Sequence, residues 1–190
     1  MKHEFWDIYD KYITRPGADS LKAWLLSTDF ETAPASTKFH GAYEGGLIAH
    51  SANVWKELVR LLKAYPEVKV SAETAAVVAL LHDLCKIGCY KTELRNTKVN
   101  GVWVQRPTYV FNEDFCFGGH GSKSVYLAHR YIDLTPEEAV AINCHMGSWD
   151  RSASDYGVGT AYEQNALAWL LHVADESATY IRESNIKYNT

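Results

Sequence analysis

The spacing of apolar residues along the chain is mostly that of α-helices. Near-helical spacing of leucine and valine, followed by Pro66, predicts a helix over residues 47–64. The run AAVVALLHDL is apolar nearly all round, which predicts a buried central helix over residues 71–85. Residues 30–46 contain proline, serine and a pair of glycines, and we expect a loop there. Further helices are expected at 3–13, 19–28, 121–132, 135–147 and 162–184.

The period of the pattern changes between residues 90 and 111. Alternating and β-branched residues flank Asn100-Gly101 there, and this dipeptide is a strong signal for a two-residue hairpin turn. Thr135, with proline and glutamate at the first and third positions after it, predicts the start of a later helix. The chain shows no internal repeat or interdomain linker. The pattern therefore predicts an all-α bundle with one β-hairpin, with residues 1–190 in a single domain.

Composition and charge restrict the class of partner. The chain has 190 residues and a net charge of −4, without a basic run. Non-specific binding to a polyanion needs a positive surface, so we do not expect a long nucleic acid as partner. The N-terminus is too acidic and aromatic for a signal peptide, and no apolar stretch of about 18 residues suggests a membrane span. The four cysteines lack CxxC spacing, so we expect buried thiols in a cytoplasmic protein. The oligomeric state stays open.

Ionisable residues recur inside or beside the apolar segments. A protein interior of this size rarely accepts several unpaired groups of this kind. Helical bundles build metal sites from ligands on facing helices, so we expect these groups to converge and hold metal ions. They are, in chain order, His50, His82, Asp83, His120, His145 and Asp175.

Two ions can share this ligand set if Asp83 bridges them. The set then divides into His50, His82, Asp83 and Asp175 for one ion and Asp83, His120 and His145 for the other. The second ion would keep more positions open for water and substrate. Because the ligands are rich in imidazole, we expect two divalent ions of Mn, Fe, Co or Ni in preference to Mg.

The order His…His-Asp…His…His…Asp resembles the two-metal branch of the HD-domain superfamily of metal-dependent phosphohydrolases. The segments FHGAYEGGLIAHS and LLHDLCKIG carry this resemblance, which covers roughly residues 36–180. It implies an all-helical HD fold and hydrolysis of a phosphomonoester or phosphodiester, usually of a nucleotide. One departure is Cys85, which stands where the family often has glycine.

Three residues are candidates for contacting the substrate. Lys86 follows His82 by about one helical turn, so its ammonium group would face a bound phosphate. Lys123 and Ser124 lie at an expected helix N-terminus, whose free amides suit an anion. The alternatives without a substrate contact are a charge that stabilises a helix C-terminus for Lys86 and a solvated surface position for Lys123.

The expected reaction is attack of metal-activated water on phosphorus, with Asp83 as the central catalytic ligand. His40 is a candidate acid for the leaving group. The substrate is expected to be a small nucleotide or a cyclic or short oligonucleotide phosphodiester. A 3′–5′ exonuclease is an alternative that would need a basic groove, and a metal-containing nucleotide-sensing module is another. The loop 147–159 is a candidate lid over the site.

Overall fold

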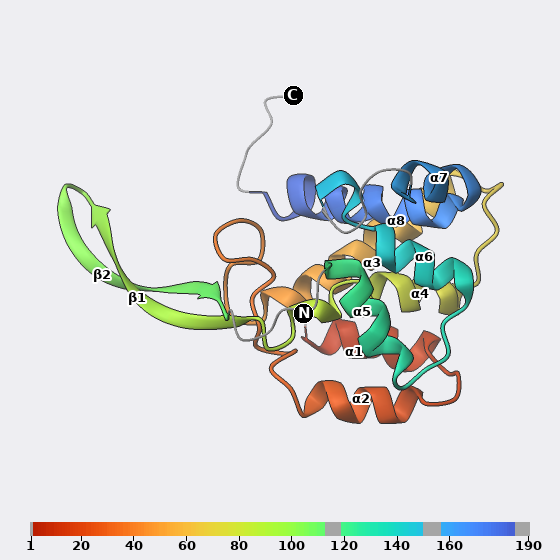
Figure 1. Cartoon of the computed structure of the whole chain (residues 1–190), viewed down its shortest axis with the longest axis horizontal. Coiled ribbons are helices and arrows are strands. Elements are labelled where there is room, and N and C mark those ends of the chain that lie inside the picture. The colour runs from red at the N-terminus through yellow and green to blue at the C-terminus, as the bar shows by residue number, and fades with distance from the viewer. Residues whose placement is uncertain (1, 113–118, 150–156, 185–190) are drawn as a thin grey trace.

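The computed structural model describes residues 2–112, 119–149 and 157–184, which form a helical bundle with one hairpin. Figure 1 shows the hairpin projecting from one side of the bundle. The helices are α1 (Lys2–Tyr12), α2 (Ala18–Leu26), α3 (Gly46–Ala64), α4 (Ala72–Leu81), α5 (His120–His129), α6 (Pro136–Cys144), α7 (Gly157–Gln164) and α8 (Ala166–Ser177). The strands are β1 (Tyr90–Val99) and β2 (Val102–Phe111). The predicted all-α bundle with a hairpin is confirmed.

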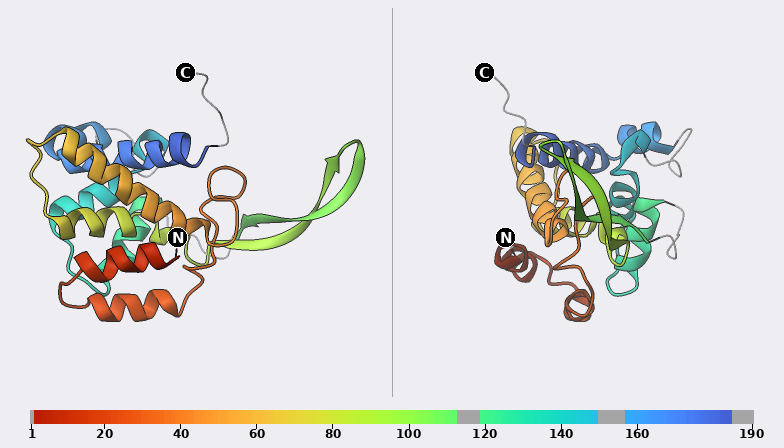
Figure 2. Two further views of the ribbon diagram at one scale, coloured as in Figure 1. Left: turned by 180° about the vertical axis from the view of Figure 1, so that it is seen from behind. Right: turned by 90° about the vertical axis from the view of Figure 1, so that its left-hand side faces the viewer.

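Helices α3 and α4 form the centre of the bundle. Every residue of α4 from Ala75 to Leu81 is buried. One apolar cluster joins these helices to α1, α2 and α5, and a second joins them to α6 and α8. Figure 2 shows α1 and α2 on one side of the central helices and α8 on the other. Because α4 is covered on all sides, its sequence has no polar face.

The hairpin has the register that its Asn-Gly turn predicts. Its strands pair antiparallel from Tyr90 opposite Phe111 to Val99 opposite Val102. Asn100 and Gly101 both have positive φ, 50° and 85°, as the tightest hairpin turns require. Most residues of both strands are exposed to solvent.

Helix α4 ends at Leu81, four residues earlier than the predicted 85. His82 is its C-cap, and a single 3₁₀ turn, Leu84–Lys86, follows Asp83. In a continued helix, the N–H of Cys85 would donate to the carbonyl of Leu81. It donates instead to Ser124 Oγ, at 3.0 Å, so a residue of α5 replaces the helical acceptor.

The C-terminal segment also differs from the single helix predicted over 162–184. It divides into α7 and α8 at Asn165, whose side chain caps α8 by accepting from the N–H of Leu167. A wider π-type turn, Ala178–Arg182, follows α8. The candidate lid, 147–159, lies largely outside the described residues. Of its described part, Gly147–Trp149 is a 3₁₀ turn and the last residues begin α7.

The start of α6 carries the predicted capping box. Thr135 Oγ1 accepts from the N–H of Glu138, and the Glu138 carboxylate accepts from the N–H of Thr135. The same carboxylate is fully buried and accepts two hydrogen bonds from Arg15, at 2.7 and 2.8 Å. Helix α6 is thereby tied to the turn between α1 and α2. In the described part of the chain, every helix is too short or too polar to cross a membrane.

Candidate metal centre

Five of the six predicted metal ligands lie together inside the bundle. Each comes from a different helix or helix end, except for the adjacent pair that follows α4. All five side chains are buried. They are His50 on α3, His82 and Asp83 at the end of α4, His145 at the end of α6, and Asp175 on α8.

Asp83 lies at the middle of this cluster. Its Oδ2 atom is 3.3 Å from His82 Nε2 and 3.8 Å from His50 Nε2. Its Oδ1 atom is 3.6 Å from His145 Nε2. Asp175 approaches from α8, with Oδ1 3.0 Å from His50 Nε2. Two carboxylates are thus interleaved with three imidazole rings.

Backbone carbonyls fix the orientation of two of the rings. His82 Nδ1 lies 2.9 Å from the carbonyl oxygen of Ala79, and His145 Nδ1 lies 2.7 Å from that of Ile142. A carbonyl only accepts, so in each ring Nδ1 carries the proton. The Nε2 atom of each ring is therefore directed into the cluster, which is the usual arrangement of histidine ligands to metals.

The Nε2 atoms of His50, His82 and His145 are buried and form no hydrogen bond with the described residues. Buried polar atoms normally have a partner, so three such nitrogens beside two carboxylates need an explanation. A divalent cation supplies one. The ligand atoms of His50, His82 and Asp83 lie within 4.8 Å of one another, as do those of His82, His145 and Asp175. The donor set fits a transition metal.

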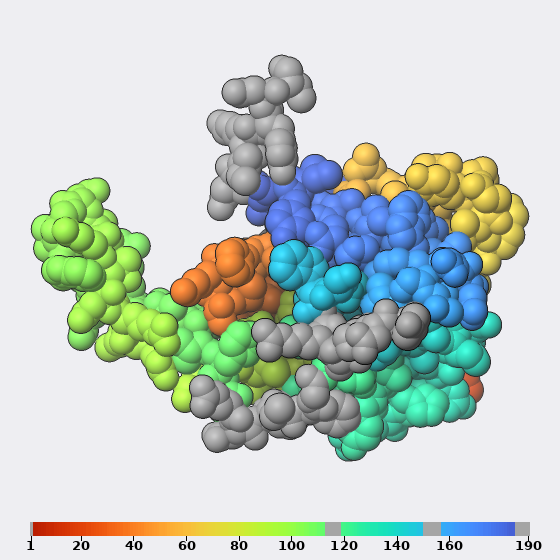
Figure 3. All heavy atoms as spheres, turned by 45° about the horizontal axis from the view of Figure 1, so that its top comes forward, coloured from red at the N-terminus to blue at the C-terminus, as the bar shows by residue number. Residues whose placement is uncertain are grey.

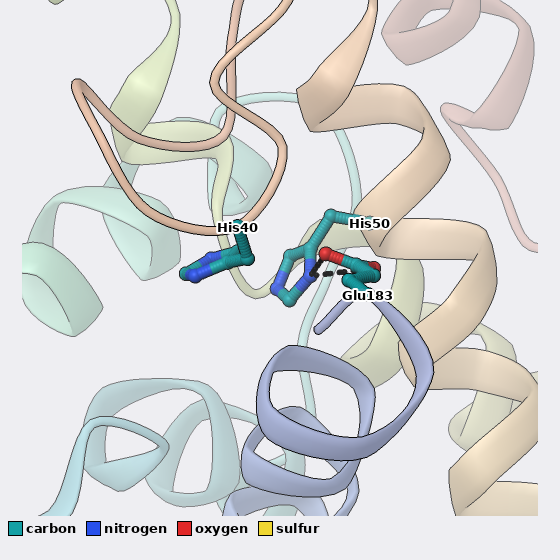
Figure 4. Close-up of side chains that lie close together, drawn as sticks. All are labelled: His40, His50 and Glu183. Carbon is teal, nitrogen blue, oxygen red and sulfur yellow. Dashed lines mark hydrogen bonds and ion pairs between the residues drawn. The ribbon is translucent and has the colours of Figure 1, made fainter. Parts of the chain in front are cut away.

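A third group of potential ligands includes Glu183, which the sequence analysis did not identify. Both carboxylate oxygens of Glu183 lie 3.2 Å from His50 Nδ1, and Asn53 Nδ2 donates to Glu183 Oε1 at 2.9 Å. Figure 4 shows His50 between this carboxylate and the ring of His40, whose centroid is 4.7 Å from that of His50. Glu183 lies eight residues after Asp175, which in a regular helix is about 80° around the axis, so helical spacing did not indicate it.

Burial opposes the charged form of each group in the cluster, and neighbouring charges decide the outcome. Burial by itself would lower the pKa of His50, but the two carboxylates beside it raise that pKa to about 10. Burial likewise opposes ionisation of Asp83, but Lys86 and the imidazoles hold its pKa well below the usual range. For His40, burial and then the charge on His50 lower the pKa to about 4. The ionised carboxylates therefore attract a positive charge to the cluster, which is either the proton on His50 or a metal ion in its place.

Residues 47–180 match the family model of the HD domain, and this range contains the whole buried cluster. The chain belongs to the HD domain family. Over 161 residues it is 41% identical to the dihydroneopterin 2',3'-cyclic phosphate phosphodiesterase of Methanocaldococcus jannaschii. The match covers 83% of this chain and 55% of the relative, so the chain spans about half the length of that curated protein. No solved structure shows a significant match to the chain.

The groups of candidate ligands overlap, so the predicted division into two sets stays a prediction. His145 lies with His82 and Asp175 because the end of α6 faces the end of α4 across the cluster. His120 is the first residue of α5 and is exposed, and it is absent from all three groups found among the described residues. Its assignment as a ligand stays a prediction.

Lys86 lies close to the cluster, although not on the helical face that was predicted. The 3₁₀ turn after α4 brings its Nζ atom to 2.6 Å from Asp83 Oδ2, and the side chain is buried. The ammonium group therefore contacts a candidate metal ligand directly.

Lys123 and Ser124 are buried, and they contact the backbone of the same turn. Lys123 Nζ donates to the carbonyl of Cys85 and lies 3.1 Å from Cys89 Sγ, while Ser124 Oγ accepts from the N–H of Cys85. These contacts hold the turn that follows Asp83. The phosphate contact predicted for this pair stays a prediction.

Proposed function

We propose that this HD domain protein is a metal-dependent phosphohydrolase that cleaves a phosphoester bond of a nucleotide or nucleotide-like molecule. The observation that carries the proposal is that three buried imidazole nitrogens, which form no hydrogen bond with the described residues, converge on two ionised carboxylates. The name of the relative from Methanocaldococcus jannaschii supports a cyclic phosphodiester as the kind of bond that is cleaved.

The residues proposed to hold metal are His50, His82, Asp83, His145 and Asp175, with His120 as a further ligand if a second ion binds. Mn, Fe, Co or Ni suits this imidazole-rich set better than Mg. A divalent ion bound there supplies a nucleophile from water at neutral pH and stabilises charge on the phosphate oxygens.

The surrounding side chains orient the ligands. Lys86 contacts Asp83 Oδ2 and keeps that carboxylate ionised, so it fixes the central ligand in the orientation that the imidazoles need. Its positive charge also favours an anionic substrate beside the cluster. Lys123 and Ser124 act indirectly on the site, because they hold the backbone turn that carries Lys86.

His40 is a further residue for which we propose a substrate contact. Neither ring nitrogen forms a hydrogen bond within the described residues, although both nitrogens are buried. Because its pKa is lowered to about 4, His40 is neutral at neutral pH and is poorly suited to the leaving-group acid role predicted from sequence. We propose that it forms a hydrogen bond with the substrate instead.

The test combines metal analysis with turnover. We expect purified protein to contain transition metal and to hydrolyse a nucleoside 2',3'-cyclic phosphate or an aryl phosphodiester with added Mn. The variant Asp83→Ala should lose its bound metal. Its kcat/KM should fall at least about 1000-fold, equivalent to about 4 kcal/mol of transition-state stabilisation. The matched control is Asp133→Ala, because Asp133 is exposed and belongs to none of the groups of candidate ligands. Full activity in Asp83→Ala would refute the site, and bound metal without turnover would favour the sensing module.

A further inference from the structure

One face of the hairpin carries closely spaced positive charge. The antiparallel register places Arg95 directly opposite Arg106, and Lys91 lies on the same face because side chains alternate along a strand. Like charges directly opposite each other destabilise a strand pair. Glu93 is the acidic residue on this face, 3.6 Å from Lys91 and 3.7 Å from Arg95. The face keeps a net positive charge in a chain whose net charge is −4.

A groove of about 360 Å³ lies at the base of this hairpin, between the strands and the loop that precedes α3. Its charged residues are Lys38 from the loop and Lys91, Glu93 and Arg95 from β1. Three positive groups against one negative group make the groove complementary to an anion. Its remaining lining residues are Thr37, Tyr109, Val110 and Phe111.

The groove is connected to the metal centre by the loop before α3. Lys38 precedes His40 by two residues, and the ring of His40 is 4.7 Å from that of His50. Tyr90, the residue before Lys91, donates its hydroxyl to the carbonyl of Ala35 at 3.3 Å, which fastens the hairpin base to this loop. Figure 3 shows the loop and the hairpin base side by side on one face of the molecule.

We propose that this groove binds a second phosphate of the substrate, next to the phosphoester that is cleaved. The inference rests on the proposed function and deepens it, because it makes the preferred substrate a short oligonucleotide and not a mononucleotide. A substrate with its scissile phosphoester at the metal centre would pass His40 and place its neighbouring phosphate between Lys38 and Lys91. Arg95, which lies opposite Arg106 and lines the groove, then has an anionic partner.

The test compares two substrates that differ by one nucleotide. They are adenosine 2',3'-cyclic phosphate and the adenosine dinucleotide that ends in a 2',3'-cyclic phosphate. Lys38→Glu and Lys91→Glu each place a negative charge in the groove, from different elements. Lys98→Glu is the matched control, because Lys98 is an exposed lysine of the same strand near the hairpin tip and does not line the groove.

We expect the wild type to favour the dinucleotide in kcat/KM. Each groove variant should lower the ratio of the dinucleotide value to the mononucleotide value about tenfold, mainly through KM, as for a lost phosphate contact. Lys98→Glu should leave the ratio unchanged. The preference for the dinucleotide should also weaken as salt is raised, because the charged residues of the groove are exposed.

Equal losses on both substrates, or a ratio that changes equally in Lys98→Glu, would overturn the groove assignment. If the metal-containing wild type cleaves neither substrate, the proposed function fails separately. Binding of the fluorescently labelled dinucleotide then tests the groove by itself, with weaker binding expected in Lys91→Glu than in Lys98→Glu. Affinity that rises with every nucleotide added up to six would overturn the short-oligonucleotide assignment in favour of a longer single strand.

Discussion

The interaction between Glu183 and His50 gives a sharp test of how the metal centre is built. Glu183→Gln keeps the size of the side chain and removes its charge. In the wild type, the half-buried carboxylate accepts from His50 Nδ1 at 3.2 Å and from Asn53 Nδ2 at 2.9 Å. A carboxylate that accepts from the far side of a histidine ligand raises the basicity of that ligand and fixes the orientation of its ring.

The size of the effect follows from these contacts. A hydrogen bond to a charged group contributes about 1.5–3 kcal/mol and one between neutral groups about 1 kcal/mol. The glutamine oxygen retains a neutral bond, so the substitution should cost about 1–2 kcal/mol of metal binding. This is a loss of about 5- to 30-fold in affinity. We expect little change in global stability, because the side chain remains hydrogen-bonded.

Metal affinity is measured by competition with a chelator of known affinity, alongside kcat at saturating metal. Glu163→Gln is the matched control, since Glu163 is an exposed residue of α7 and undergoes the same change of charge. Asn53→Ala should give a smaller loss, because it frees Glu183 without removing it. Unchanged affinity in Glu183→Gln, with a normal unfolding curve, would show that the carboxylate does not support His50 as a ligand.

Three further predictions concern the bundle. Arg15→Ala should lower the free energy of unfolding in urea by about 3 kcal/mol, because it leaves the buried Glu138 carboxylate without its cation. The control is Lys22→Ala, which removes the exposed ion pair with Asp10. It should lower the free energy of unfolding by at most about 1 kcal/mol. Burial opposes ionisation of Glu138, but Arg15 holds its pKa below the ordinary value. The stability that this pair contributes is therefore present above about pH 4.5 and is lost as the pH falls through the lowered pKa. When the free energy of unfolding is measured at decreasing pH, Glu138→Gln should lose less stability than the wild type. An identical slope in the two proteins would show that the Arg15–Glu138 pair does not cause the loss. Gly121→Ala should destabilise the protein, because its Cβ would lie 2.1 Å from a backbone oxygen of α6. The control is Gly159→Ala on α7, because a Cβ there meets no atom within 4 Å. We expect this variant to raise the free energy of unfolding by up to about 1 kcal/mol.

Local patterns predicted the elements whose causes are local. The apolar run of α4, the Asn100-Gly101 turn and the Thr135 capping box are each specified by residues within one or two turns of one another. The five buried ligands were also predictable, because ionisable residues inside apolar segments need a common partner. Their arrangement around Asp83 was not, because it depends on how the ends of α4 and α6 face each other.

The end of α4 shows why the arrangement of the candidate ligands could not be predicted from the sequence. Residues 82–85 continue the apolar helical pattern, and the acceptor that ends the helix is Ser124, 39 residues away along the chain. Adjacent residues of a continued helix would point about 100° apart, so one of His82 and Asp83 would leave the cluster. Because the chain turns at this point, Asp83 lies between His82 Nε2 and His145 Nε2.

Glu183 gives the same argument at the other end of the chain. In an ideal helix, it would lie about 80° around the axis from Asp175, away from the same target. The π-type turn over Ala178–Arg182 changes this angle, and Arg182 donates to Glu57 on α3, which holds the turn against that helix. Glu183 consequently meets the Nδ1 side of His50 while Asp175 meets the Nε2 side. Two irregular turns, each fixed by a contact to a distant helix, thus bring together the candidate ligands of the proposed metal centre.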